Sequence, residues 1–166
     1  MIFCPQGVLG DGGGVAQLCP NADSVAKYFT EVIIDGNLVI PPQKPPKTHI
    51  VKTTTLITLK DVEVIEVTLP DGTTGKKILV AGIITLGIQY VADVPSQKVH
   101  FVHYEIPFEA LVLDDCGDLL PSDDTIFTNG FVPHVCVEKL RLVQIDNRTI
   151  NKTIVLQVWI EEIPAP

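Results

Sequence analysis

The most constraining feature of the sequence is a row of alternating apolar residues in the middle of the chain. From Ile78 to Tyr90, every second residue is apolar or a glycine. A period of two places these side chains on one face of a β-strand. The intervening residues begin apolar and become polar, which predicts a strand buried on both faces at one end and half-solvated at the other. Turn residues follow at 93–96, and a second strand is predicted over 99–106.

Similar alternation elsewhere predicts an all-β fold, as a β-sandwich or as a jelly-roll-like or barrel-like domain. Asp35-Gly36-Asn37 predicts a hairpin turn between two short strands. Four prolines at 41–46 predict an extended linker that crosses an edge of the fold. No segment predicts a long helix. Further strand patterns cover residues 48–69, 108–113, 131–145 and 153–163.

Residues 1–23 form an extended N-terminal arm that differs from the single β-domain expected at 24–166. The arm holds five of the twelve glycines and two of the four cysteines, but no Lys or Arg. It also carries more apolar side chains than a disordered tail usually does. These predict an arm that docks on a neighbouring subunit, with a frayed terminus as the alternative. The apolar docking candidates are Ile2, Phe3, Val8, Leu9, Val15 and Leu18.

The overall composition favours protein partners. Hydrophobic residues make up 46% of the chain and charged residues only 19%, which indicates large contacts with other chains or, alternatively, a core rich in Val and Ile. The net charge of −8 argues against nucleic acid as a partner. No apolar run approaches the roughly 20 residues of a membrane-spanning helix, so no membrane insertion is predicted. The first residues lack the features of a signal peptide, so we expect synthesis in the cytoplasm and later exposure.

The four cysteines divide evenly between the arm and the body. Cys4 and Cys19 lie in the arm, whereas Cys116 and Cys136 lie in the predicted β-domain. Their spacings match no zinc module. The division allows arm-to-body disulfides, which between neighbouring subunits would link an assembly covalently. The alternative is four reduced thiols in a cytosolic protein.

An acidic loop is the sequence's candidate for a metal site. It contains Asp114, Asp115 and Asp118, and clustered carboxylates suit hard cations such as calcium. The spacing does not match the EF-hand pattern, so a solvated loop is the favoured interpretation. No nucleophile–base pair, phosphate-binding loop or metalloprotease motif is present, and we therefore predict neither an enzymatic activity nor a cofactor.

Four short elements occur in order in the middle of the chain, at 77–82, 88–91, 99–100 and 105–108. Together they resemble the SPOCS domain family, found in bacterial endospore coat and spore-morphogenesis proteins. The resemblance covers about residues 48–160 and implies a non-enzymatic β module that assembles protein layers around the spore. It also implies structural roles for the signature positions Gly82, Tyr90, His100, Pro107 and Phe108.

The arm, the cysteines, the composition and the resemblance together predict a structural subunit. We expect it to self-assemble, as a homopolymer, into a filament or layer on an endospore or cell surface. Other spore-coat proteins are expected as further partners, and the mother-cell cytoplasm as the place of synthesis. The alternative is a non-polymerising adaptor that recruits another coat protein through one sheet face.

Overall fold

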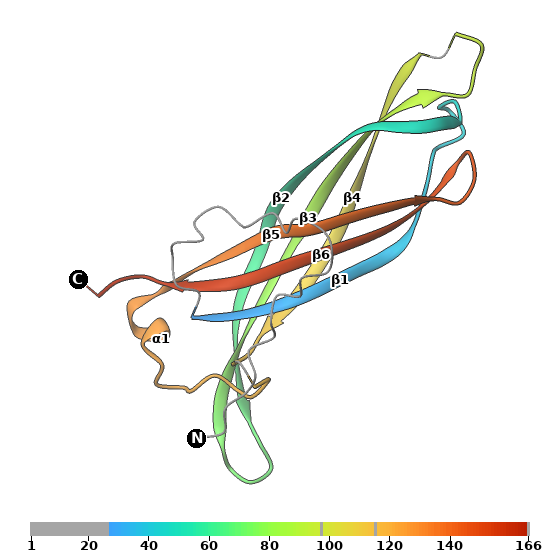
Figure 1. Cartoon of the computed structure of the whole chain (residues 1–166). Helices are drawn as coiled ribbons and strands as arrows, with labels where there is room; N and C mark the ends of the chain where they lie inside the picture. The colour runs from blue at the N-terminus through green and yellow to red at the C-terminus, as the bar shows by residue number, and fades with distance from the viewer. Residues whose placement is uncertain (1–26, 97, 115, 166) are drawn as a thin grey trace.

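The computed structural model describes residues 27–96, 98–114 and 116–165. These residues form six β-strands and one short helix (Figure 1). The predicted all-β fold is confirmed. In chain order the elements are β1 (Tyr28–Val39), β2 (Lys47–Thr68), β3 (Thr74–Ala92), β4 (Val99–Val112), α1 (Thr125–Asn129), β5 (Phe131–Gln144) and β6 (Thr149–Glu162).

The strands form two antiparallel, three-stranded sheets that pack face to face as a sandwich (Figure 1). Sheet A has the order β1-β6-β5 and sheet B the order β2-β3-β4. The central strands are therefore β6 and β3. Along one side of the sandwich β1 contacts β4, and along the other side β5 contacts β2. The chain passes from sheet A to sheet B between β1 and β2, and returns between β4 and β5.

The alternating row that dominates the sequence is the inner face of β3. All seven of its residues are buried, as predicted. The prediction for the other face of this strand is wrong, because Leu79, Ala81 and Ile83 are only partly buried rather than enclosed. None of the helices or strands in the described part of the chain covers this outer face of sheet B. The buried inner residues are Ile78, Val80, Gly82, Ile84, Leu86, Ile88 and Tyr90.

The predicted hairpin at Asp35-Gly36-Asn37 is wrong, because β1 continues straight through it. In the register with β6, Gly36 lies opposite Lys152 and Asn37 opposite Asn151. A Cβ at position 36 would lie only 2.9 Å from Lys152 Nζ. Glycine therefore makes room for a lysine of the neighbouring strand rather than for a turn. Pairing of β1 with the whole of β6 outweighs the local preference for a turn. The sequence alone does not reveal this pairing.

The segment 108–113 is not a separate short strand, because β4 runs without interruption from Val99 to Val112. Pro107 lies inside this strand. A proline removes one backbone N–H, but β4 is an edge strand of sheet B, and edge strands are the part of a sheet where proline is tolerated. The edge position therefore allows one long strand where the sequence predicted two.

The last strand also begins earlier than predicted, at Thr149 rather than at residue 153. The side chain of Asp146 explains the difference. Its Oδ1 accepts hydrogen bonds from the backbone N–H groups of Arg148 (2.8 Å) and Thr149 (2.7 Å). This Asx-type turn closes the β5–β6 loop within a few residues, so Thr149 already lies in the strand.

The linker at 41–46 joins the two sheets, but its first half is a turn rather than the predicted extended segment. The N–H of Lys44 donates to the carbonyl of Pro41 at 3.0 Å. Arg148 fixes this turn from the opposite loop, since its Nη1 donates to Pro41 O (3.1 Å) and Lys44 O (3.0 Å). One guanidinium thus holds the crossing between the sheets.

A close contact between β3 and β4 lies at the centre of sheet B. Gly82 and Phe108 are directly opposite in the register. A Cβ added at Gly82 would lie 2.8 Å from Phe108 Cζ and 2.5 Å from the carbonyl oxygen of Thr58 on β2. The aromatic ring and the neighbouring backbone therefore occupy the space that any larger residue would need.

We predict that Gly82→Ala destabilises the sandwich by about 1–3 kcal/mol, because the added methyl group overpacks a buried position. Urea unfolding followed by circular dichroism measures the free energy of unfolding. The control is Thr85→Val, at a partly buried position on the outer face of the same strand, which should stay within about 0.5 kcal/mol of the unchanged protein. Equal stability of the two variants would contradict the packing argument.

Candidate functional site

The two cysteines of the β-domain lie on different elements. Cys116 is in the loop between β4 and α1, and Cys136 is on β5 in sheet A. Both are disulfide-bonded. The arm residues that the sequence nominates lie outside the described residues: Ile2, Phe3, Cys4, Val8, Leu9, Val15, Leu18 and Cys19.

Cys136 lies in an aromatic and polar setting on the outer face of sheet A. It is 9% exposed, and its Sγ lies 3.9 Å from the carbonyl oxygen of Gln157. A disulfide sulfur carries no proton, so this is a packing contact. Two residues earlier on β5, the ring of His134 stacks on Trp159 with centroids 4.1 Å apart. His134 Nε2 also lies 2.7 Å from a carboxylate oxygen of Glu161. Cys136 is therefore held in a firmly packed part of the sheet.

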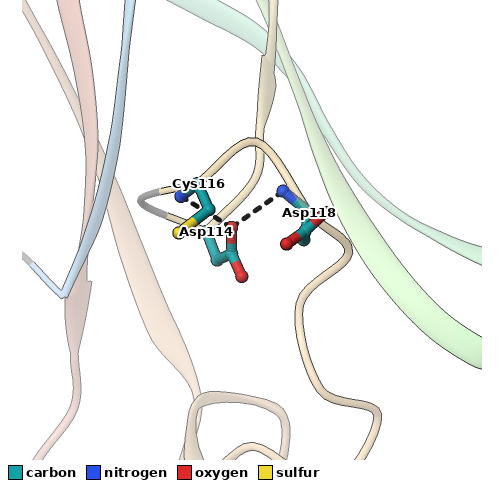
Figure 2. A group of neighbouring side chains, drawn as sticks. All are labelled: Asp114, Cys116 and Asp118. Atoms are coloured by element: carbon teal, nitrogen blue, oxygen red, sulfur yellow. Dashed lines mark hydrogen bonds between the residues drawn. The ribbon is translucent and has the colours of Figure 1, made fainter. Parts of the chain in front are cut away.

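Cys116 lies in a tight, exposed loop that Asp114 organises (Figure 2). One carboxylate oxygen of Asp114 accepts hydrogen bonds from the N–H of Cys116 (2.9 Å) and the N–H of Asp118 (2.8 Å). Gly117, with φ of 75°, takes the left-handed conformation that the turn requires. The loop therefore presents the Cys116 disulfide at the surface in a defined backbone geometry.

The same loop is a poor cation site. The ligand atoms of Asp114, Cys116 and Asp118 lie within 4.8 Å of one another. Metal ions bind cysteine as a thiolate, however, and the sulfur of Cys116 is in a disulfide. One oxygen of Asp114 is already taken by two backbone donors. Asp115, the third aspartate of the sequence-based candidate, lies outside the described residues. The chemistry of the described donors favours a turn cap over a metal site.

A pocket of about 420 Å³ lies beside this loop. Its apolar lining comes from the β2–β3 hairpin and from the segment after β4, and includes Leu69, Leu113 and Leu119. Lys77 supplies a positive charge, and Asp118 of the Cys116 loop lies at its wall.

A network of charged groups fixes the start of β1, where the arm joins the β-domain. Lys27 Nζ donates to Asp124 Oδ1 (2.9 Å), Glu162 Oε2 (3.2 Å) and the hydroxyl of Thr125 (3.1 Å). The hydroxyl of Tyr28 donates to the other oxygen of Asp124. The side chain of Asp124 is 7% exposed. The network ties the start of β1 to α1 and β6.

These contacts set the protonation of Asp124. Burial raises the pKa of its carboxyl, but hydrogen bonds from the Tyr28 hydroxyl, the Ile126 N–H and the Lys27 ammonium outweigh burial. The pKa of Asp124 is therefore lowered from the ordinary 3.8. This network was not predicted from the sequence, because Lys27 and Asp124 are separated by 97 positions.

The signature positions of the sequence resemblance have structural roles. Tyr90 stacks on His100 with ring centroids 5.9 Å apart, and its hydroxyl donates to the carbonyl of Pro45 at 2.8 Å. It therefore fastens β3 to the linker between the sheets. Gly82 and Phe108 form the close contact of sheet B described above. The structure thus pairs four of the five positions, and the fifth, Pro107, lies on the edge strand β4.

The two long sides of the sandwich differ in how well they are closed. Along the β1–β4 side, the inward-facing residues Val102 and Phe108 of β4 are 3% and 4% exposed. On β2, across sheet B, the inward-facing residues Leu59, Val62 and Val64 are 39%, 38% and 39% exposed. Their register partners on β3 are inner-face residues, so these three side chains point toward the core side. We call the β2–β5 side the open side.

A narrow groove of about 190 Å³ separates β2 from β5 on the open side. Thr53 and Thr55 line it from β2, and Val137 and Leu140 line it from β5. Within the described residues, neither β2 nor β5 has a strand partner on this side. Sequence reasoning missed the open side, since alternation gives the faces of a strand but not which side of a sandwich remains uncovered.

The geometry defines a β-sandwich with one disulfide-bonded cysteine in an exposed loop, a second at a nearly buried position of sheet A, and one incompletely covered side. A model of the SipL, SPOCS domain family matches residues 48–139, which is more than half of the chain. The chain belongs to the SPOCS domain family. No curated protein and no solved structure matches it.

Family membership associates the chain with a spore-related role and with a structural, non-enzymatic kind of domain. The family suspected from the short sequence elements is thereby confirmed. The matched segment runs from β2 into β5 and includes all five signature positions. None of the helices formed by the described residues has the length and apolar character needed to span a bilayer.

We predict that Asp124→Asn lowers the free energy of unfolding at neutral pH by about 1–3 kcal/mol, because it weakens buried, charge-assisted hydrogen bonds. Since the folded-state pKa of Asp124 is depressed, its contribution is present above the unfolded pKa and is lost as pH falls through the folded value. Urea unfolding at neutral pH and in the acid range should therefore show a difference between the proteins that shrinks with acidification.

The matched control is Asp123→Asn, which changes the exposed neighbouring carboxylate. Its free energy of unfolding should stay within about 0.5 kcal/mol of that of the unchanged protein at both pH values. A loss for Asp124→Asn that persists undiminished at low pH would contradict the role of the ionised carboxylate.

Proposed function

We propose that this chain is a structural subunit that self-assembles into a filament or layer on an endospore or cell surface. The observation that carries the proposal is the open side of the sandwich. Three apolar residues of β2 that face the core side remain more than one-third exposed, although the sandwich is otherwise well packed. Covering each of them would stabilise a contact by up to about 1 kcal/mol. A further chain segment along this side would complete the fold.

The N-terminal arm of a neighbouring subunit is the segment proposed to supply that cover. It is rich in glycine, contains six large apolar residues and joins the domain at the point fixed by the Lys27 network. Docking of one subunit's arm on the next subunit is a head-to-tail contact. Such a contact propagates into an open polymer when the rotation between successive subunits does not close a ring.

Disulfides between the arm and the domain would make the polymer durable. Cys116 forms a disulfide in an exposed loop and Cys136 forms one at a nearly buried position of β5, and the arm carries the other two cysteines, Cys4 and Cys19. Formed between neighbouring subunits, each bond would contribute about 2–4 kcal/mol and slow dissociation. Phe3, next to Cys4, is an apolar side chain of the kind that the pocket beside Cys116 can accept.

The proposed partners are other copies of the chain and, at the spore surface, other spore-coat proteins. Family membership supports the spore setting. Exposure on the spore coat or as an extracellular appendage would place the cystines where disulfides persist.

A second candidate function is an adaptor that recruits a coat protein through one sheet face without polymerising. The outer face of β4 favours it, because Val99, Phe101 and Leu111 are 60%, 47% and 42% exposed. A contact on this face predicts a defined complex with a different protein. Negative-stain electron microscopy of the purified chain separates the two functions, since only the first produces filaments or layers.

We predict that the purified chain gives a ladder of covalent multimers on non-reducing electrophoresis, and that the ladder collapses with reductant. The double variant Cys4→Ser/Cys19→Ser should lose the ladder, because no arm cysteine remains to form the bond. Gln6→Ser, a substitution in the same arm that spares both cysteines, is the control and should keep it. Monomer in every lane for the unchanged protein would contradict covalent cross-linking.

We further predict that deletion of residues 2–20 leaves a folded monomer. The reason is that the sheets and both hydrophobic clusters are built from residues after the arm. Size-exclusion chromatography with light scattering measures the mass, and circular dichroism checks the fold. Polymers that persist after the deletion would contradict the role of the arm.

A further inference from the structure

The open side contains one stretch of β2 that is suited to accept an added strand. Between the register shifts at Ile50/Lys52 and Leu59/Asp61, Thr53–Leu59 pairs regularly with β3. The stretch reads Thr-Thr-Thr-Leu-Ile-Thr-Leu, with no charge, no proline and no glycine. Uncharged, regular edge segments of this composition readily pair with further strands.

This stretch is also accessible. Leu56 is 64% exposed, and the three threonines at its start are exposed as well. β2 is an edge strand of sheet B, so its second backbone edge has no strand partner among the described residues. Lys52 and Lys60 bracket the stretch, and the groove lined by Thr53 and Thr55 runs beside it. These seven residues are therefore an uncharged part of the edge with a lysine at each end.

The charges favour the arm over a second copy of β2 as the occupant. Antiparallel pairing of Thr53–Leu59 with itself would place Lys52 of one copy opposite Lys60 of the other, and like charges in that position are destabilising. The arm has no Lys or Arg and contains Asp11 and Asp23, so its charge complements the bracketing lysines.

The arm has one segment that suits strand pairing. Residues 15–19, Val-Ala-Gln-Leu-Cys, are its longest stretch without glycine, proline or charge. The preceding run, 10–14, contains four glycines and gives the chain freedom to reach the edge. In a strand, Val15 and Gln17 would face one side while Ala16 and Leu18 would face the other.

We propose that residues 15–19 of a neighbouring copy add to β2 as an edge strand along Thr53–Leu59. This inference rests on the proposed self-assembly and specifies the docking edge. The added strand lies beside the groove between β2 and β5, and one of its rows of side chains joins the inward-facing row of this stretch, which includes Thr53, Thr55 and the exposed Leu59. Backbone hydrogen bonds supply the attraction.

The test places a photoreactive p-benzoylphenylalanine at Leu56 of the full chain. Leu56 points to the outer face of sheet B, where a residue of the added strand would lie within about 5 Å. Isotopically heavy and light subunits are co-assembled, irradiated and analysed by mass spectrometry. The expected product joins position 56 of one subunit to the arm segment around residues 15–19 of another.

The matched control carries the same photoreactive residue at Phe101, which is exposed on the outer face of the opposite edge strand β4. It should give no cross-link to the arm. The proposal would be overturned if position 56 cross-links to the arm of the same subunit. It would also be overturned if the cross-links from position 56 do not include the arm, for example if they join β2 to β2.

A second pair of variants tests the edge without a photoreactive group. Leu56→Lys should reduce the yield of assembled protein at least about tenfold, because a charge in the middle of an edge blocks strand addition. Phe101→Lys should leave the yield unchanged, and circular dichroism should show both variants folded. Assembly that is unaffected by Leu56→Lys overturns the docking edge but leaves self-assembly standing. Absence of any assembly of the unchanged protein overturns the proposed function and this inference with it.

Discussion

Burial of the inner face of β3 is the interaction on which the rest of the structure depends. Its alternating side chains lie under sheet A, and its two edges pair with β2 and β4 over almost their whole length. The glycine at position 82 in this row brings the Phe108 ring and the Thr58 carbonyl within contact distance. Because β3 is paired on both edges, its position determines where the edge strands can lie, and only the β4 edge is closed by sheet A.

The functional interpretation follows from the difference between those two edges. The inward residues of β4 are almost fully buried, whereas the inward apolar residues of β2 remain partly exposed. A sandwich can tolerate such a side, since isolated exposed apolar residues are common. Here, however, the exposed residues lie in a row beside an edge that has no strand partner among the described residues. Membership of the SPOCS family gives this feature a spore-related setting.

Much of the fold was predictable, because period-two alternation is a strong local signal. It predicted the buried face of β3 and the all-β fold. The short elements around Tyr90 and Phe108 indicated the family. The errors arose where long-range pairing overrides local preference. Asp35-Gly36-Asn37 looks like a turn until Lys152 is known to lie across from Gly36. Pro107 looks like a strand boundary until β4 is known to be an edge strand.

The candidate site was less predictable. The even division of the cysteines and the apolar character of the arm could be seen in the sequence. The open side could not, because it depends on which strands face each other across the sandwich. The Lys27–Asp124 contact likewise joins residues from opposite ends of the chain. The acidic loop illustrates a related limit, since a cluster of aspartates has the same sequence signature whether it binds a cation or caps a turn, as Asp114 does.

The most direct test of the account is backbone hydrogen exchange in the assembled and the dissociated protein. If another chain completes the sandwich on its open side, amides of Thr53–Leu59 should exchange much more slowly in the assembly. Amides at the opposite edge, in β4 (Val99–Val112), should change little. Equal exchange of Thr53–Leu59 in the two states, in an assembly confirmed by electron microscopy, would contradict the claim that subunits join along this edge.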